Sequence, residues 1–139
     1  MDIKILLNQY TNLSYDDLIK SSKESLEYII PQLKLILNSE EDVSQVLIYF
    51  TSVLLSADST ATEKEIMFLS DLFSLSNDEI KAMYKIGLVD EITIVIDHLF
   101  DSLNPGLKTH LLNYCLCFMA VDGNIDNKEI TFVEKLVSE

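Results

Sequence analysis

The sequence predicts an all-α fold: a single domain over residues 1–139, built as a bundle of seven or eight helices. Apolar residues recur at spacings of three and four almost throughout the chain, which is the period of an amphipathic helix, and no useful length of strand alternation interrupts them. The chain also has only three Gly and two Pro, which is few for a β fold with many turns.

Four predicted helices begin at a Ser or Thr that stands three positions before an acidic residue, which is the pattern of an N-cap. They cover residues 14–37, 39–57, 62–73 and 76–87. Pro31 lies inside the first of them, and we expect it to kink or split that helix. Gly87 is expected to end the fourth in a left-handed conformation.

Three more helices are predicted in the second half of the chain. Residues 92–103 carry an apolar stripe, and the β-branched run ITIVI at 92–96 is assigned to this helix because the stripe continues beyond it. Asn104 caps the next helix, with Pro105 at its first position, and this helix runs to Val121. A last helix begins at Asn127.

The acidic excess limits the partners that the chain can bind. With 23 acidic and 10 basic residues, the formal net charge of −13 repels nucleic acid and anionic lipid and favours cations or a basic protein partner. The N-terminus lacks the pattern of a signal peptide, and the longest apolar stretches are shorter than the ~18–20 residues that span a bilayer. We therefore expect a cytoplasmic protein without direct membrane insertion. Its oligomeric state is not predicted.

Cys115 and Cys117 are the two cysteines of the chain. Helical residues two apart point about 200° apart, so this pair is not placed to share a metal ion or to form a strain-free disulfide. We expect two reduced side chains that fill the core.

The chain matches itself without gaps when Asp58 is laid over Asp122. ADSTATEKEIMFLSDL at residues 57–72 then coincides with VDGNIDNKEITFVEKL at residues 121–136, and Glu65 falls on Glu129. Each copy follows one of the two most apolar helices. We therefore predict two pseudo-symmetric helix–turn–helix repeats, at about residues 43–73 and 107–137, with the two apolar helices packed side by side.

This repeated unit resembles a known family. The pattern Ala-x-Asp-Gly-x-Ile-x-x-x-Glu after an apolar helix is similar to that of the TerB-like tellurite-resistance proteins, a helical domain also seen in some DnaJ-like co-chaperones. The second copy fits the pattern, whereas the first has Ser59 for Gly, Ala61 for Ile and Thr62 for the second acid. The resemblance implies a TerB-like fold and a setting in stress or tellurite resistance.

The acidic turns offer oxygen ligands for a divalent cation. Asp126 and Glu129 are three residues apart and face the same way on a helix, and Asp122 precedes them in the turn. Oxygen ligands suit calcium, magnesium or manganese. TerB-like proteins are associated with divalent metal at these turns, which implies that Asp58 and Glu65 contribute from the first copy.

The same residues also fit ordinary helix capping. Asp-Gly is a turn signal, and Asp126 with Glu129 and Thr62 with Glu65 have the spacing of a capping box. The segment is not an EF-hand, because Gly123 directly follows the first Asp and the Glu comes too early. Cation binding and plain capping both stay open, and no cofactor is established.

Three functions are weighed on this basis. The first is a non-enzymatic TerB-like binding or scaffold module with divalent cations at the paired acidic turns. The second is a metal-independent acidic adaptor for a basic protein partner. The third is a metal-dependent hydrolase, which is disfavoured because it needs a base beside the metal and the sequence offers no His or Cys at such a place. His98 and His110 also have no Ser or Cys at a spacing that suggests a nucleophile. We therefore predict a protein that is not an enzyme.

Overall fold

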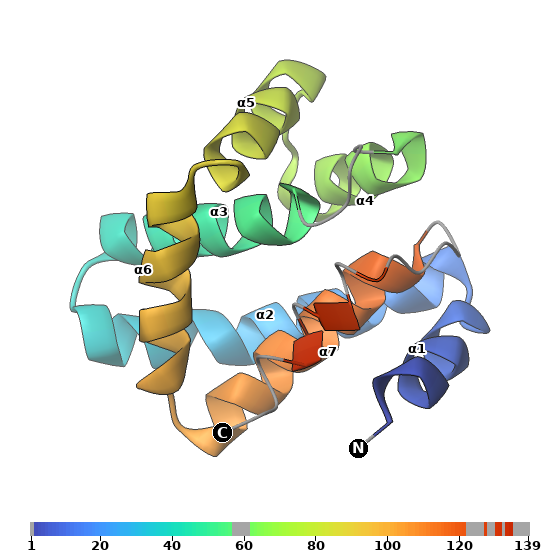
Figure 1. Ribbon diagram of the computed structural model, residues 1–139, viewed down its shortest axis with the longest axis horizontal. Helices are drawn as coiled ribbons and strands as arrows, with labels where there is room; N and C mark the ends of the chain where they lie inside the picture. The colour runs from blue at the N-terminus through green and yellow to red at the C-terminus, as the bar shows by residue number, and fades with distance from the viewer. Residues whose placement is uncertain (1, 57–61, 122–126, 128–129, 132, 135–139) are drawn as a thin grey trace.

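The computed structural model describes residues 2–56, 62–121, 127, 130–131 and 133–134. Over these residues the fold is all-α, as predicted, and no strand occurs among them. Its helices are α1 (Ile3–Thr11), α2 (Tyr15–Leu37), α3 (Glu40–Ser56), α4 (Glu63–Phe73), α5 (Asn77–Gly87), α6 (Asp90–Asp101) and α7 (Pro105–Ala120) (Figure 1). Residues 127, 130–131 and 133–134 are also helical, which agrees with the last predicted helix.

Local side-chain bonds start most of these helices, as the sequence predicts. In each case an oxygen of the cap residue accepts the amide proton of the residue three positions on, at 2.8–3.4 Å: Ser14 from Asp17, Ser39 from Asp42, Thr62 from Glu65, Ser76 from Glu79 and Asn104 from Leu107. The run ITIVI lies within α6, so its assignment to a helix is confirmed.

The first helix, α1, is not among those expected from the sequence. The Asp2 carboxylate caps it by accepting the amide protons of Lys4 and Ile5 at 3.0 and 3.3 Å. Ile3 and Leu7 are buried on its inner face, and α1 packs mainly against α7. A helix of nine residues is too short to be stable by itself, so tertiary contact stabilises it.

The expected split at Pro31 does not occur. α2 runs unbroken from Tyr15 to Leu37 with Pro31 inside it, and it ends at Asn38, whose φ of 61° is left-handed. The buried face of α2 continues on both sides of the proline, through Ile29 and Leu33. Tertiary burial therefore holds together a helix that the missing amide donor would weaken.

The expected left-handed end at Gly87 is also wrong. Gly87 is the last residue of α5, and the backbone of Leu88 after it is right-handed, with φ −80°. A Cβ atom at Gly87 would lie 1.9 Å from the backbone oxygen of Ser52 on α3. The glycine is required because α5 and α3 approach each other closely at this point.

Two helix pairs dominate the packing. α2 packs most extensively against α7, and α3 against α5 (Figure 1). The two apolar helices α3 and α7 are therefore not each other's main partners, contrary to expectation. They meet through side chains instead: the Tyr114 hydroxyl lies 2.8 Å from Thr51 Oγ1, and its ring lies 6.3 Å from that of Phe50.

α7 can contact several helices because it is buried along most of its length. Every residue from Tyr114 to Ala120 is buried. The ring of Tyr114 meets Phe73 of α4 edge-on at 6.3 Å, and Phe118 meets Phe68 of α4 at 6.1 Å. These aromatic side chains belong to the core, as the apolar faces predict.

The first predicted repeat corresponds to α3 and α4, and the second begins with α7. The turns that would relate them, residues 57–61 and 122–126, lie outside the described residues. The pseudo-two-fold relation therefore stays a prediction. None of the described helices combines the length and apolar character needed to span a membrane.

The Thr51–Tyr114 bond can be tested by a double-mutant cycle. We expect Tyr114→Phe to lower the free energy of unfolding by about 1–3 kcal/mol, because it leaves the buried Thr51 hydroxyl without its partner. Thr51→Val should cost a similar amount. The double variant should lose less than the sum, since both polar groups are then removed. Urea unfolding followed by circular dichroism measures all three, and additive losses would contradict the bond.

The close approach at Gly87 predicts a steric penalty. Gly87→Ala should lower the free energy of unfolding by about 1–3 kcal/mol, because the new methyl group meets backbone that has to shift. Gly106→Ala is the matched control: its Cβ would meet the Tyr28 hydroxyl at 2.8 Å, a side-chain atom that can move away. Equal losses in the two variants, measured by urea unfolding, would argue against this packing.

Candidate functional site

The structure describes one of the five predicted metal ligands. Asp58, Asp122, Asp126 and Glu129 lie outside the described residues. Glu65 lies in the first turn of α4 and is described in full. The role of Glu65 in the fold can therefore be stated from its contacts.

Glu65 is part of a complete capping box. Its Oε1 accepts the backbone amide proton of Thr62 at 2.9 Å, and its own amide donates to Thr62 Oγ1 at 3.2 Å. The Thr62 hydroxyl also lies 3.2 Å from the same Oε1. The side chain is 2% exposed, which is rare for Glu. Glu65 therefore has a structural role whether or not a cation binds nearby.

The described residues contain no group of three or more His, Cys, Asp or Glu side chains that could hold a metal ion. The second capping box, Ser76 with Glu79, has the same bonds as the first, but it lies on the surface. Glu65 and Glu79 thus occupy the same position in their helices for the same reason, which is capping. Of these two residues, only Glu65 was predicted to be a metal ligand.

Two open grooves flank the first turns of α3. The α2–α3 groove, about 500 Å³, has an apolar lining of Ile30, Pro31, Val43 and Leu47, with Lys34, Glu40 and Ser44 beside them. The α3–α5 groove, about 550 Å³, is lined by Ile48, Tyr49, Ile86, Gln45 and Glu41, and it shares Glu40 and Ser44 with the first. Glu40 and Ser44 therefore form the ridge between the two grooves.

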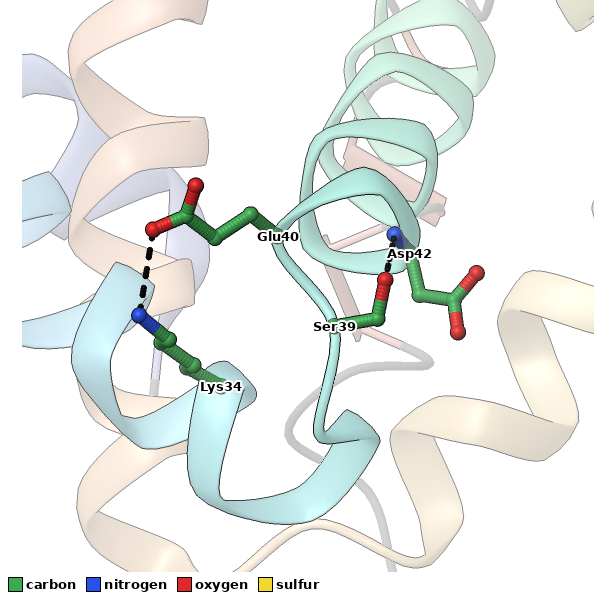
Figure 2. A network of polar contacts seen from close by, with 4 residues as sticks. All are labelled: Lys34, Ser39, Glu40 and Asp42. Carbon is green, nitrogen blue, oxygen red and sulfur yellow. Dashed lines mark hydrogen bonds and ion pairs between the residues drawn. The ribbon is translucent and has the colours of Figure 1, made fainter.

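The acidic side chains at this end of α3 point in different directions (Figure 2). Glu40 reaches back to α2, where its Oε1 lies 3.1 Å from Lys34 Nζ. Asp42 points to the other side of the helix start, and its backbone amide donates to Ser39 Oγ at 3.4 Å. Acids in the first turn also stabilise the helix through its dipole.

A polar cluster joins α2 and α7 beside a third pocket of about 400 Å³, which α1 also lines. Asn113 Nδ2 donates to Ser25 Oγ at 2.7 Å and to Ser21 Oγ at 3.0 Å, and Asn113 Oδ1 accepts from the Tyr10 hydroxyl at 2.5 Å. Burial raises the pKa of Tyr10 and keeps it a donor. Because these groups bond to one another, the cluster fixes the three helices rather than presenting free polar groups.

His110 lies at the edge of this polar cluster. Its ring stacks on Tyr28 with centroids 4.1 Å apart, and its Nδ1 lies 3.5 Å from Ser25 Oγ. This structural role of His110 was not predicted from the sequence. The spacing of Ser21 and Ser25 by four, which places both on one side of α2, is the signal that could have indicated a polar contact there.

The two cysteines are buried and reduced, as expected. Burial raises the pKa of the Cys115 thiol well above its ordinary value, and the neighbouring Cys117 adds to this. Burial also raises the pKa of Cys117, while the Ser22 and Ser21 hydroxyls act in the opposite direction. Both thiols stay protonated near neutral pH, so neither offers a ready nucleophile.

Comparison with protein-family models, curated proteins and solved structures gives no match to this chain. The TerB-like resemblance therefore rests on the sequence pattern alone and stays a prediction.

The two capping boxes form a natural pair for testing the role of Glu65. We expect Glu65→Ala to lower the free energy of unfolding by about 1–2 kcal/mol, because the part-buried Thr62 amide loses its acceptor. Glu79→Ala should cost less, since water can replace the carboxylate at an exposed cap. Glu65→Gln keeps an acceptor oxygen and should retain most of the stability.

Urea unfolding in the presence of a chelator measures these three variants without any contribution from metal. A Glu65→Gln loss as large as that of Glu65→Ala would contradict a capping role and would favour a requirement for the charge.

Proposed function

We propose that this chain is a non-enzymatic binding module that engages a protein partner with a basic surface. The distribution of charge carries the proposal. Over the described side chains, every Asp and Glu is exposed except Glu65, and the whole chain has a formal net charge of −13. The core is built from apolar residues with a few Ser and Thr, so the charge is available to a partner.

Such a surface favours some partners and repels others. A field of one sign attracts an oppositely charged protein over several ångströms, raises the association rate and makes it depend on ionic strength. It repels nucleic acid, anionic membranes and a second copy of the same chain. Among macromolecules, a basic protein is the class of partner that this surface favours.

The chemistry of the described grooves supports binding rather than catalysis. The two grooves beside α3 combine apolar side chains with Ser, Glu and Lys, and the thiols are buried away from them. His110 is engaged by Tyr28 in a stack. His110 does face the pocket between α1, α2 and α7, but its Nδ1 lies 3.5 Å from Ser25 Oγ, which is longer than the hydrogen bond by which a base activates a nucleophile.

A TerB-like cation site is the second candidate. The ungapped self-match favours it, because it pairs Asp58 with Asp122 and Glu65 with Glu129. In that case the acidic turns hold calcium, magnesium or manganese, and the protein acts in stress or tellurite resistance. Glu65 would then combine capping with ligation, through a carboxylate whose Oε1 already accepts the Thr62 amide.

Chelator sensitivity separates the two candidates. We expect the immobilised chain to capture a basic protein from a native lysate, with equal yield in chelator and in added calcium, and with loss at high salt because the attraction is screened. Calorimetric titration of chelator-treated protein with calcium, magnesium and manganese should give no heat.

Capture that disappears in chelator, together with a heat of binding that Asp122→Ala abolishes, would replace the first candidate with the second. A chain that retains no basic protein in either condition would contradict the proposed adaptor.

A further inference from the structure

We propose that the α2–α3 groove is the docking surface for a basic amphipathic helix of the partner protein. This inference rests on the proposed function and assigns it to particular residues. Three observations carry it: an apolar groove between two helices, Glu40 on its rim with Glu41 next to it in the chain, and a charge balance that disfavours other occupants.

The floor of the groove can receive apolar side chains. Val43 and Leu47, one turn apart on α3, are 4% and 8% exposed and form the buried base. Ile30, which is 42% exposed, and Pro31 form the wall on α2. A groove between two helices matches residues spaced by three and four on a third helix, because these lie on one face.

The rim provides charge complementarity. Glu40 lies between the two grooves and Glu41 lines the second, so both can meet Lys or Arg side chains that flank the apolar stripe of a bound helix. In the free protein Glu40 pairs with Lys34 at 3.1 Å, and these side chains are 83% and 56% exposed. An ion pair this exposed contributes little to stability. A cationic side chain of the partner can therefore displace Lys34 from Glu40.

The same charges argue against the other occupants of an apolar groove. A second copy of the chain would place Glu40 and Glu41 against another strongly acidic surface. An anionic membrane would meet the same repulsion. The groove is also open and mostly apolar, whereas a site for a small polar ligand needs several converging polar groups.

The probe for testing this inference is a labelled peptide of roughly three heptads, with leucine on one face and lysine on the other. A peptide with glutamate in place of lysine is the control. We expect fluorescence anisotropy to show binding of the lysine peptide alone. In ¹⁵N-labelled protein, the amide shifts that change should lie on the last turns of α2 and the first turns of α3.

Matched variants separate groove binding from general attraction. Ile30→Ser should weaken peptide binding about tenfold, whereas Ile36→Ser should have little effect; Ile36 is similarly exposed on α2, at 48%, but it does not line the groove. The double variant Glu40→Lys with Glu41→Lys should also weaken binding about tenfold. Asp78→Lys with Asp101→Lys, which has the same net charge, should weaken it far less.

Each other outcome contradicts the inference in a distinct way. If both charge-reversed variants weaken peptide binding equally, and the amide shifts spread over the acidic surface, the groove is not the docking surface. The proposed function would still stand. Absence of peptide binding by the unmodified protein overturns helix docking, while capture of a basic protein from lysate still decides the proposed function. A dimer that Ile30→Ser dissociates would assign the groove to a second copy instead.

Discussion

A buried phenol has to find a hydrogen-bond partner, and this constraint fixes how the two most apolar helices meet. Tyr114 of α7 is fully buried, and burial raises the pKa of its hydroxyl, which stays neutral and bonds to Thr51 of α3. Its ring is packed against Phe50 and Phe73. If α7 rotated or slid, it would break this bond where no water can replace it. The bond therefore sets the register between α3 and α7. The helices α2 and α5 pack around this pair.

The consequence for function is a separation between the inside and the surface. The core uses apolar and small hydroxyl side chains, and Glu65 is the one described carboxylate inside it, held there by the capping box of α4. The other acids whose side chains are described face solvent. This separation, with little ionisable chemistry inside and much charge of one sign outside, is what supports the proposed role in binding. The seams where α3 meets α2 and α5 are two of the places where that surface is hollowed and apolar.

Sequence reasoning succeeded where the cause is local. A cap oxygen and the amide three residues on are brought together by one turn of backbone, so Thr62 with Glu65 could be recognised from spacing alone. It failed where the cause lies elsewhere in the chain. Gly87 was assigned to a local turn because the Ser52 backbone that it faces is 35 positions away in the sequence and invisible to a local pattern. α1 was missed because its contact with α7 is what stabilises it. For the candidate metal site, spacing identified the acids but could not decide between capping and ligation.

The sequence by itself determined the helical class, the starts of the five helices with Ser, Thr or Asn caps, and the acidic surface. These depend on periodicity, on interactions within one turn and on composition, all of which can be counted along the chain. Only the tertiary structure decided that α3 pairs with α5 and α7 with α2, that Pro31 is tolerated within a helix, and that His110 stacks on Tyr28. The physical reason is that packing selects among helix faces by the shape and volume of side chains far apart in sequence, and several pairings satisfy the same apolar pattern equally well.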